Sequence, residues 1–114
     1  MLSRLLGMKP AVPETDVASL VRDRASGKEL QIVDVREPDE YAAGHMPGAR
    51  LIPLGQLPAR TGELDPAKPV VVVCRSGNRS ATATEFLLKS GFQDVKNLVG
   101  GMIAWVQAGQ PVQR

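Results

Sequence analysis

The sequence predicts one α/β domain built as three layers, with a mostly parallel central sheet and helices on both faces. Short β-branched apolar runs alternate along the chain with segments of helical spacing, which is typical of parallel α/β folds. The run at 70–73 is four valines, as expected of a strand buried on both faces. We assign this domain to residues 11–114, a length that can bury a core without disulfides. Residues 1–10 form an N-terminal extension that we expect to be flexible.

The first half of the chain is expected to contain two helices and two strands. Val17, Leu20 and Val21 have helical spacing, whereas Pro38 and Gly44 are favourable at the start and end of a short helix. We predict a helix over about 15–24, a strand over 30–35, a helix over 37–45, a strand over 49–53 and weakly helical turns over 54–64.

The second half is expected to contain two further strand–helix units. We predict a strand over 69–74, a helix over 80–90, a strand over 94–99 and a helix over 100–109. Ser80 is assigned as the N-cap of the first of these helices and Gly91 as the residue just past its end. Helical spacing places Met102, Ile103 and Trp105 in the core rather than in a ligand pocket.

Composition excludes several classes of function. A net charge of +2, without a basic run, gives no indication of nucleic-acid binding. The single cysteine, Cys74, excludes an internal disulfide and a cysteine-based zinc site, and we expect neither a metal nor a cofactor. A lone free thiol fits a reducing compartment. The first ten residues are too short to span a membrane and lack the pattern of a signal peptide, so we expect a cytoplasmic protein.

Cys74 begins the segment "CRSGNRS", residues 74–80, between the strongest predicted strand and a predicted helix. A lone cysteine after an apolar strand is often a small packed side chain. Here, however, Gly77 permits a tight turn, and Arg75 and Arg79 place two cations near the sulfur. A helix N-terminus, inward-pointing N–H groups and nearby cations all stabilise a thiolate. The segment therefore favours a reactive thiol that needs no histidine base.

The segment "CRSGNRS" after a valine-rich strand resembles the active-site loop of rhodanese-type sulfurtransferases. The segments "VDVREPDEYAAGHMPGARLIP" and "LVGGMIAWVQAGQPV" resemble two further signatures of that family, in the same order and spacing. The resemblance implies the rhodanese fold. It also implies an enzyme that moves sulfane sulfur from a donor such as thiosulfate, through a cysteine persulfide, to cyanide, another thiol or a protein acceptor.

The resemblance also implies roles for individual residues. Cys74 would be the nucleophile and persulfide carrier, and Arg75 and Arg79 would attract the anionic donor and stabilise a sulfite-like leaving group. The persulfide would be held by the loop that follows the nucleophile, namely Arg75, Ser76, Gly77, Asn78, Arg79 and Ser80. Whether the hydroxyls of Ser76 and Ser80 contact the persulfide or only cap the helix is left open by the sequence.

The length and sequence of the same loop also bear on alternative activities. Cysteine phosphatases and arsenate reductases need a larger loop, with arginine six residues after the cysteine, whereas that position here is Ser80 and the arginine comes one residue early. Many rhodanese-like domains are non-enzymatic binding or regulatory modules, but those commonly lack the cysteine that is present here. A sulfur-relay module remains an alternative. With arginines at its second and sixth positions, this loop resembles the loop of thiosulfate-type enzymes. The loop of mercaptopyruvate-type enzymes instead resembles Cys-Gly-Ser-Gly-Val-Thr.

Three polar residues outside the loop are candidates for supporting roles. Asp34 and Arg36, at the end of a predicted strand, are expected to form a buried or half-buried ion pair that holds the loops. His45, the only histidine, is expected to fix a turn by hydrogen bonds rather than act as a base. Three acidic residues nearby are expected to be solvated at a helix start: Glu37, Asp39 and Glu40.

Overall fold

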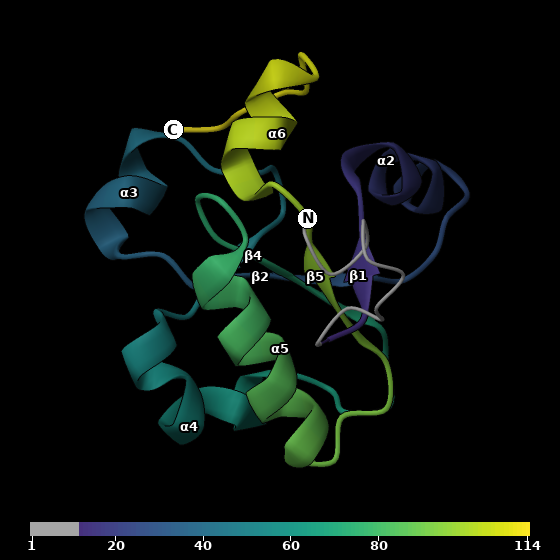
Figure 1. Ribbon diagram of the computed structural model, residues 1–114, viewed down its shortest axis with the longest axis vertical. Helices are drawn as coiled ribbons and strands as arrows, with labels where there is room; N and C mark the ends of the chain where they lie inside the picture. Colours follow the sequence, from purple (N-terminus) through teal and green to yellow (C-terminus); the bar gives the residue numbers. More distant parts are fainter. Residues whose placement is uncertain (1–11) are drawn as a thin grey trace, which may run out of the picture.

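A computed structural model describes residues 12–114, so the predicted N-terminal extension lies outside the described residues. A five-stranded sheet has the order β1-β5-β4-β2-β3, and every pair of neighbouring strands is parallel. The strands are β1 (Glu14–Thr15), β2 (Gln31–Asp34), β3 (Arg50–Leu51), β4 (Val70–Val73) and β5 (Val95–Leu98). The predicted α/β class is confirmed, and the valine run forms the central strand (Figure 1).

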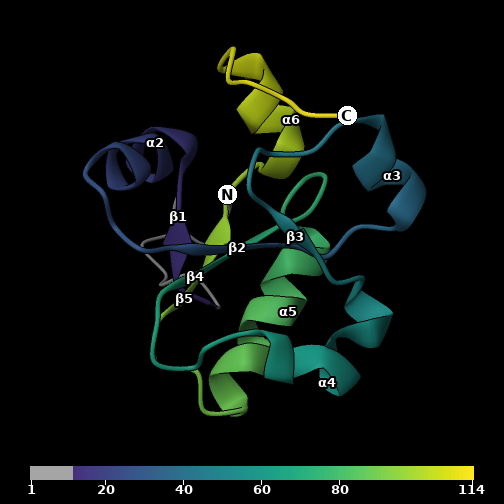
Figure 2. The ribbon, with the colours of Figure 1, turned by 180° about the vertical axis from the view of Figure 1, so that it is seen from behind.

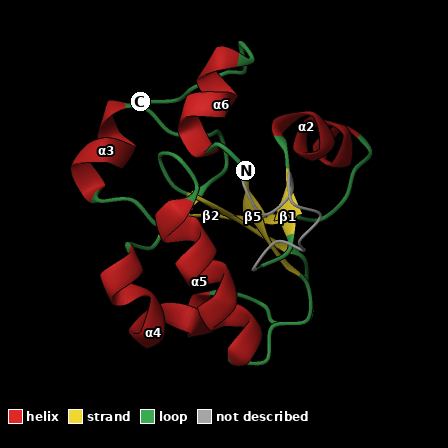
Figure 3. Cartoon of the chain, viewed as in Figure 1, coloured by secondary structure: helices red, strands yellow, loops and turns green. Residues whose placement is uncertain are grey.

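Helices cover both faces of the sheet, as predicted (Figures 1 and 2). The helical elements are α2 (Val17–Ala25), α3 (Pro38–Ala43), η1 (Leu54–Gln56), α4 (Leu57–Arg60), η2 (Thr61–Glu63), α5 (Asn78–Lys89) and α6 (Gly101–Gln107). Figure 3 shows α4 and α5 on one side of the strands and α2 and α6 on the other. None of the helices in residues 12–114 is long and apolar enough to cross a membrane.

The alternation of side chains along β4 divides the interior into two cores. Val70 and Val72 face the helices α4 and α5, where they pack with Leu57 and Leu87. The intervening residues face the other helical layer, and their core includes Leu20, Met102 and Trp105. Because both faces of β4 are buried, its sequence has no polar alternation, which explains the continuous apolar run.

Two predicted boundaries were wrong. The first helix begins at Val17 rather than near residue 15, because Glu14 and Thr15 pair with β5 and Asp16 is the N-cap, accepting a hydrogen bond from the Ser19 N–H. The helix α5 begins at Asn78, with Gly77 as its N-cap at φ 110°. Ser80 is therefore inside the helix and is not its cap.

Candidate active site

Cys74 lies directly after β4, at the carboxyl edge of the sheet, where parallel α/β proteins bind their ligands. Its side chain is 1% exposed and packs in the core on the α5 side. The chain then turns within three residues and enters α5. Gly77 makes this turn possible, because its left-handed backbone is strained for any residue with a side chain.

The loop directs hydrogen-bond donors at the Cys74 sulfur. The N–H of Gly77 donates to Sγ at 3.1 Å, and the Ser80 hydroxyl lies 3.2 Å from the same atom. Burial raises the pKa of the Cys74 thiol, but hydrogen bonds from the Ser80 hydroxyl and from the N–H groups of Ser80, Gly77 and Ser76 outweigh burial, so the pKa lies below the ordinary thiol value. The sequence predicted that backbone N–H groups, the helix N-terminus and the two arginines would together stabilise the thiolate; in the structure the main stabilising contacts are the local hydrogen bonds from Ser80, Gly77 and Ser76.

We expect Ser80→Ala to raise the pKa of Cys74, because the largest stabilising contribution to its thiolate is lost. Alkylation by iodoacetamide across a pH series reports this pKa directly, since Cys74 is the only cysteine in the chain. Ser76→Ala is the matched control, because Ser76 is exposed and contributes through its backbone N–H, which alanine keeps. An unchanged midpoint in Ser80→Ala would contradict the assigned role of the hydroxyl.

Asn97 on β5 supports the loop by hydrogen bonds, a role that the sequence pattern did not indicate. Its Nδ2 donates to the carbonyl of Gly77 at 3.1 Å, and its Oδ1 accepts from the Ser80 hydroxyl. An amide oxygen can only accept, so the single proton of Ser80 is given either to Asn97 or to the sulfur. The only available signal was an amide side chain within the short strand predicted over 94–99; the structure shows that Asn97 is buried.

The start of α6 fixes the other side of the loop. The N–H groups of Met102 and Ile103 donate to the carbonyls of Cys74 and Arg75, at 2.9 and 3.1 Å. Gly101 allows this approach: a Cβ at this position would lie 2.6 Å from the Arg75 carbonyl oxygen, and its φ is +53°. The second glycine of the "GG" pair in the C-terminal signature therefore has a structural reason. Ile103 was predicted to be in the core, but it is exposed.

The two arginines of the loop occupy different environments. Arg75 is exposed, and no carboxylate within residues 12–114 forms an ion pair with it. Arg79 is held by Glu40 of α3 through two hydrogen bonds, of 2.7 and 2.9 Å. The hydrogen bond from Arg79 lowers the pKa of Glu40 to about 2. Glu40 is therefore an ion-pair partner of the loop, and the prediction that it is merely solvated was wrong.

Asp34 and Arg36 form the expected buried ion pair. Arg36 donates from Nε and Nη2 to the Asp34 carboxylate, at 3.0 and 2.8 Å, and from Nη2 to the carbonyl of Gly44 at 2.8 Å. The pair thus ties the end of β2 to the end of α3. None of these hydrogen bonds involves the Cys74 sulfur.

His45 lies in the segment after α3 and forms an isolated antiparallel β-bridge. Its ring stacks on Tyr41 with centroids 3.7 Å apart, and its Nδ1 lies 2.9 Å from the Tyr41 carbonyl oxygen. Its backbone pairs with Gln113 in both directions, at 2.9 Å each. These contacts are structural in character, and none of them involves the loop of residues 74–80.

A thiol at the end of a central parallel strand, surrounded by N–H donors, is the arrangement that the resemblance implied, and comparison with known proteins decides the family. The family model described as "Rhodanese-like domain" matches residues 17–108. The chain belongs to the rhodanese-like domain family. The match includes the strand β2, the loop after Cys74 and the whole of α6.

Individual relatives agree with this assignment. The rhodanese-like domain is 40% identical over 101 residues to a protein named sulfurtransferase from Allochromatium vinosum, spanning 89% of this chain and 94% of the relative. It is 33% identical to the thiosulfate sulfurtransferase GlpE of Pseudoalteromonas translucida, covering 71% and 77% of the two chains. The crystal structure of a rhodanese-like domain protein from Staphylococcus aureus superposes with a TM-score of 0.77 at 35% identity, covering 82% and 90%.

Proposed function

We propose that this rhodanese-like sulfurtransferase carries sulfane sulfur as a persulfide on Cys74 and takes it from a donor of the thiosulfate type. The observation that supports this most strongly is the set of N–H and hydroxyl donors directed at Sγ. A persulfide ends in a sulfur anion, and a ring of preorganised donors stabilises such an anion in a water-poor site. The name of the GlpE relative favours thiosulfate as the donor.

The proposed cycle has two displacements and needs no redox cofactor. The Cys74 thiolate attacks the outer sulfur of thiosulfate, the sulfur–sulfur bond of the donor breaks, and sulfite leaves with the bonding electron pair. A nucleophile such as cyanide then attacks the outer sulfur of the persulfide, and the Cys74 thiolate leaves. In each half-reaction one bond to sulfur forms and one bond to sulfur breaks. Covalent catalysis typically divides one transfer into two such steps.

The two arginines would contribute unequally to donor binding. Arg75 is free to meet an incoming dianion, because it is exposed and has no ion pair among residues 12–114. Arg79 gives two of its five N–H donors to Glu40, so it would bind a donor oxygen only with those that remain. The hydrogen bond to Glu40 is the main cause of the raised pKa of the Arg79 guanidinium, and the charge of the Cys74 sulfur raises this pKa further.

Steady-state kinetics with thiosulfate and cyanide test the proposal. We expect thiocyanate formation with parallel double-reciprocal lines, as two separate half-reactions require. Mercaptopyruvate is the comparison donor and should be used less efficiently. Intersecting lines would contradict a covalent intermediate, and turnover with neither donor would favour a non-catalytic or sulfur-relay module instead. The predicted cytoplasmic location and the predicted absence of a cofactor remain predictions.

A further inference from the structure

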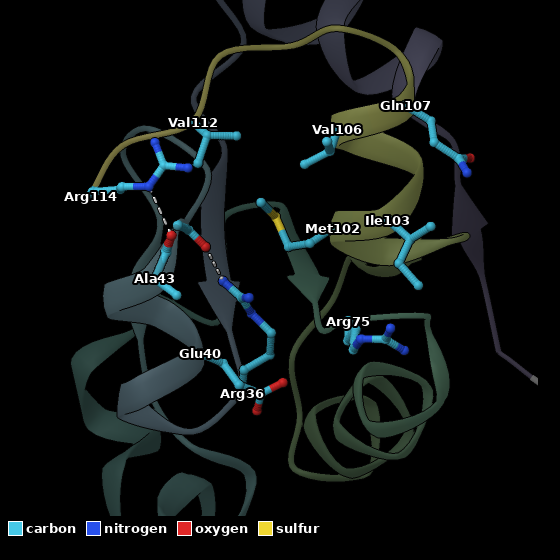
Figure 4. A pocket seen from close by; sticks show the side chains of 11 residues that line it. Arg36, Glu40, Ala43, Arg75, Met102, Ile103, Val106, Gln107, Val112 and Arg114 are labelled. Carbon is cyan, nitrogen blue, oxygen red and sulfur yellow. Dashed lines mark hydrogen bonds between the residues drawn. The ribbon is translucent and has the colours of Figure 1, made fainter.

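A groove runs from the active-site loop along α6 and is not required by the chemistry described above. It lies between α3, α6 and the C-terminal segment, and its volume is about 560 Å³. Figure 4 shows Arg75 at the loop end and Met102, Ile103, Val106, Val112 and Arg114 along the groove. Arg36 and Glu40 also line this hollow, which we refer to as the α3–α6 groove. Thiosulfate and cyanide are small hydrophilic anions, so they would gain no binding energy from a groove of this volume lined by apolar side chains.

The α3–α6 groove exposes apolar side chains near Arg75 of the active-site loop. Ile103 is 38% exposed and Val106 is 57% exposed, and they are the exposed large hydrophobic residues of the described chain. They lie one helical turn apart on α6. Exposed apolar side chains that gather at a hollow typically mark a binding surface.

This surface is fixed rigidly to the catalytic loop. The N–H groups of Met102 and Ile103 are hydrogen-bonded to the carbonyls of Cys74 and Arg75. An occupant seated against Ile103 and Val106 is therefore held in a defined position relative to the sulfur. Such positioning accelerates transfer between two large partners, because the reacting atoms are aligned in the complex.

The charges of the groove specify its occupant further. Arg36 is paired with Asp34, and Glu40 is paired with Arg79, so these charges balance one another. Arg75 and Arg114 have no such ion-pair partner within residues 12–114, and Arg75 leaves a positive charge at the loop end. A complementary ligand therefore carries a carboxylate next to its reacting group and apolar side chains further along.

We propose that the α3–α6 groove docks a protein sulfur acceptor, through a segment with a cysteine, an adjacent acidic residue at Arg75 and apolar side chains against Ile103 and Val106. The proposal rests on the function proposed above. The acceptor thiol loses its proton to water, and its thiolate attacks the outer sulfur of the Cys74 persulfide. The bond between the two sulfurs of the enzyme breaks, Cys74 leaves as a thiolate, and the acceptor becomes the persulfide.

Two synthetic peptides test the docking surface. One has a central cysteine flanked by two glutamates and followed by two leucines; in the other, lysines replace the glutamates and serines replace the leucines. Binding is measured by amide chemical shifts of ¹⁵N-labelled Cys74→Ser protein, using peptides in which serine replaces the cysteine. We expect the acidic–apolar peptide to shift the amides of Arg75, Ile103 and Val106 and to bind at least about tenfold more tightly than the basic–polar one.

Val106→Asp removes apolar surface and adds a charge that repels the acidic peptide. We expect it to weaken binding of this peptide at least about tenfold, whereas Ala108→Asp should have little effect, because Ala108 directly follows α6 and lies outside the groove. Equal binding of the two peptides, shifts located elsewhere, or an unaffected Val106→Asp protein would overturn the proposal.

A second readout separates this proposal from the proposed function. Sulfur transfer from thiosulfate-loaded protein to the acidic–apolar cysteine peptide should be faster than transfer to the basic–polar peptide, and Val106→Asp should remove the difference. If the peptide binds in the groove but thiosulfate never loads Cys74, the docking surface is supported and the donor assignment fails. If loading occurs but both peptides accept sulfur equally, the docking proposal fails alone.

Discussion

Cys74→Ser is expected to abolish sulfur transfer while leaving the fold intact. The serine hydroxyl is not ionised near neutral pH, whereas the thiolate is the nucleophile that attacks sulfur. We expect the rate of thiocyanate formation from thiosulfate and cyanide to fall by at least about a thousandfold. Serine is similar in shape to cysteine and can accept the same hydrogen bonds from Gly77 and Ser80, so the loop has no reason to rearrange.

The stability of the Cys74→Ser protein is the control for this result. Its thermal unfolding midpoint should lie within a few degrees of that of the parent protein, since no cavity forms and the donors at the site keep an acceptor. If the Cys74→Ser protein still transferred sulfur, the assignment of the nucleophile would be contradicted, because the chain has no second cysteine that could replace Cys74.

Gly101→Ala is expected to have the largest effect on the loop itself. The new methyl group would meet the carbonyls of Cys74 and Arg75, and alanine is strained at the φ of +53° found there. Strain and overpacking together should lower the free energy of unfolding by about 3 kcal/mol. The methyl group should also displace the loop, because the first turn of α6 is hydrogen-bonded to the loop carbonyls. We therefore expect slower alkylation of Cys74.

Gly109→Ala separates the two components of this effect. Gly109 also has a positive φ, of +73°, but a Cβ there would meet no neighbouring atom within 4 Å. The control should therefore lose only about 1 kcal/mol, the cost of the backbone conformation alone. Urea unfolding of both variants measures the difference. Equal losses would show that the close contact between α6 and the loop imposes no constraint.

The fold could be predicted from local patterns in the sequence. The valine run of β4 and the helical spacing in α2 each identify an element from neighbouring residues alone. The all-parallel sheet follows from the alternation of such elements. The position of Cys74 at the edge of the sheet follows in turn, because it comes directly after a central strand.

The partners of the loop could not be predicted in the same way, because they come from distant parts of the chain. Ser80 bonds to Asn97, 17 residues away, and Arg79 bonds to Glu40, 39 residues away. Serine favours N-cap positions, but α5 begins earlier, at Asn78, so the Ser80 hydroxyl lies inside the helix, where it contacts Asn97 and the Cys74 sulfur. Only the packing of α3 and β5 against the loop reveals these pairs.

Intact-protein mass spectrometry tests the central claim of a Cys74 persulfide most directly. The protein is measured after incubation with thiosulfate, again after addition of cyanide, and in parallel as Cys74→Ser. We predict a mass gain of one sulfur atom that cyanide removes and that the variant never acquires. A gain of the same mass in Cys74→Ser, or no gain in the parent protein with thiosulfate, mercaptopyruvate or a cysteine desulfurase as donor, would contradict the account.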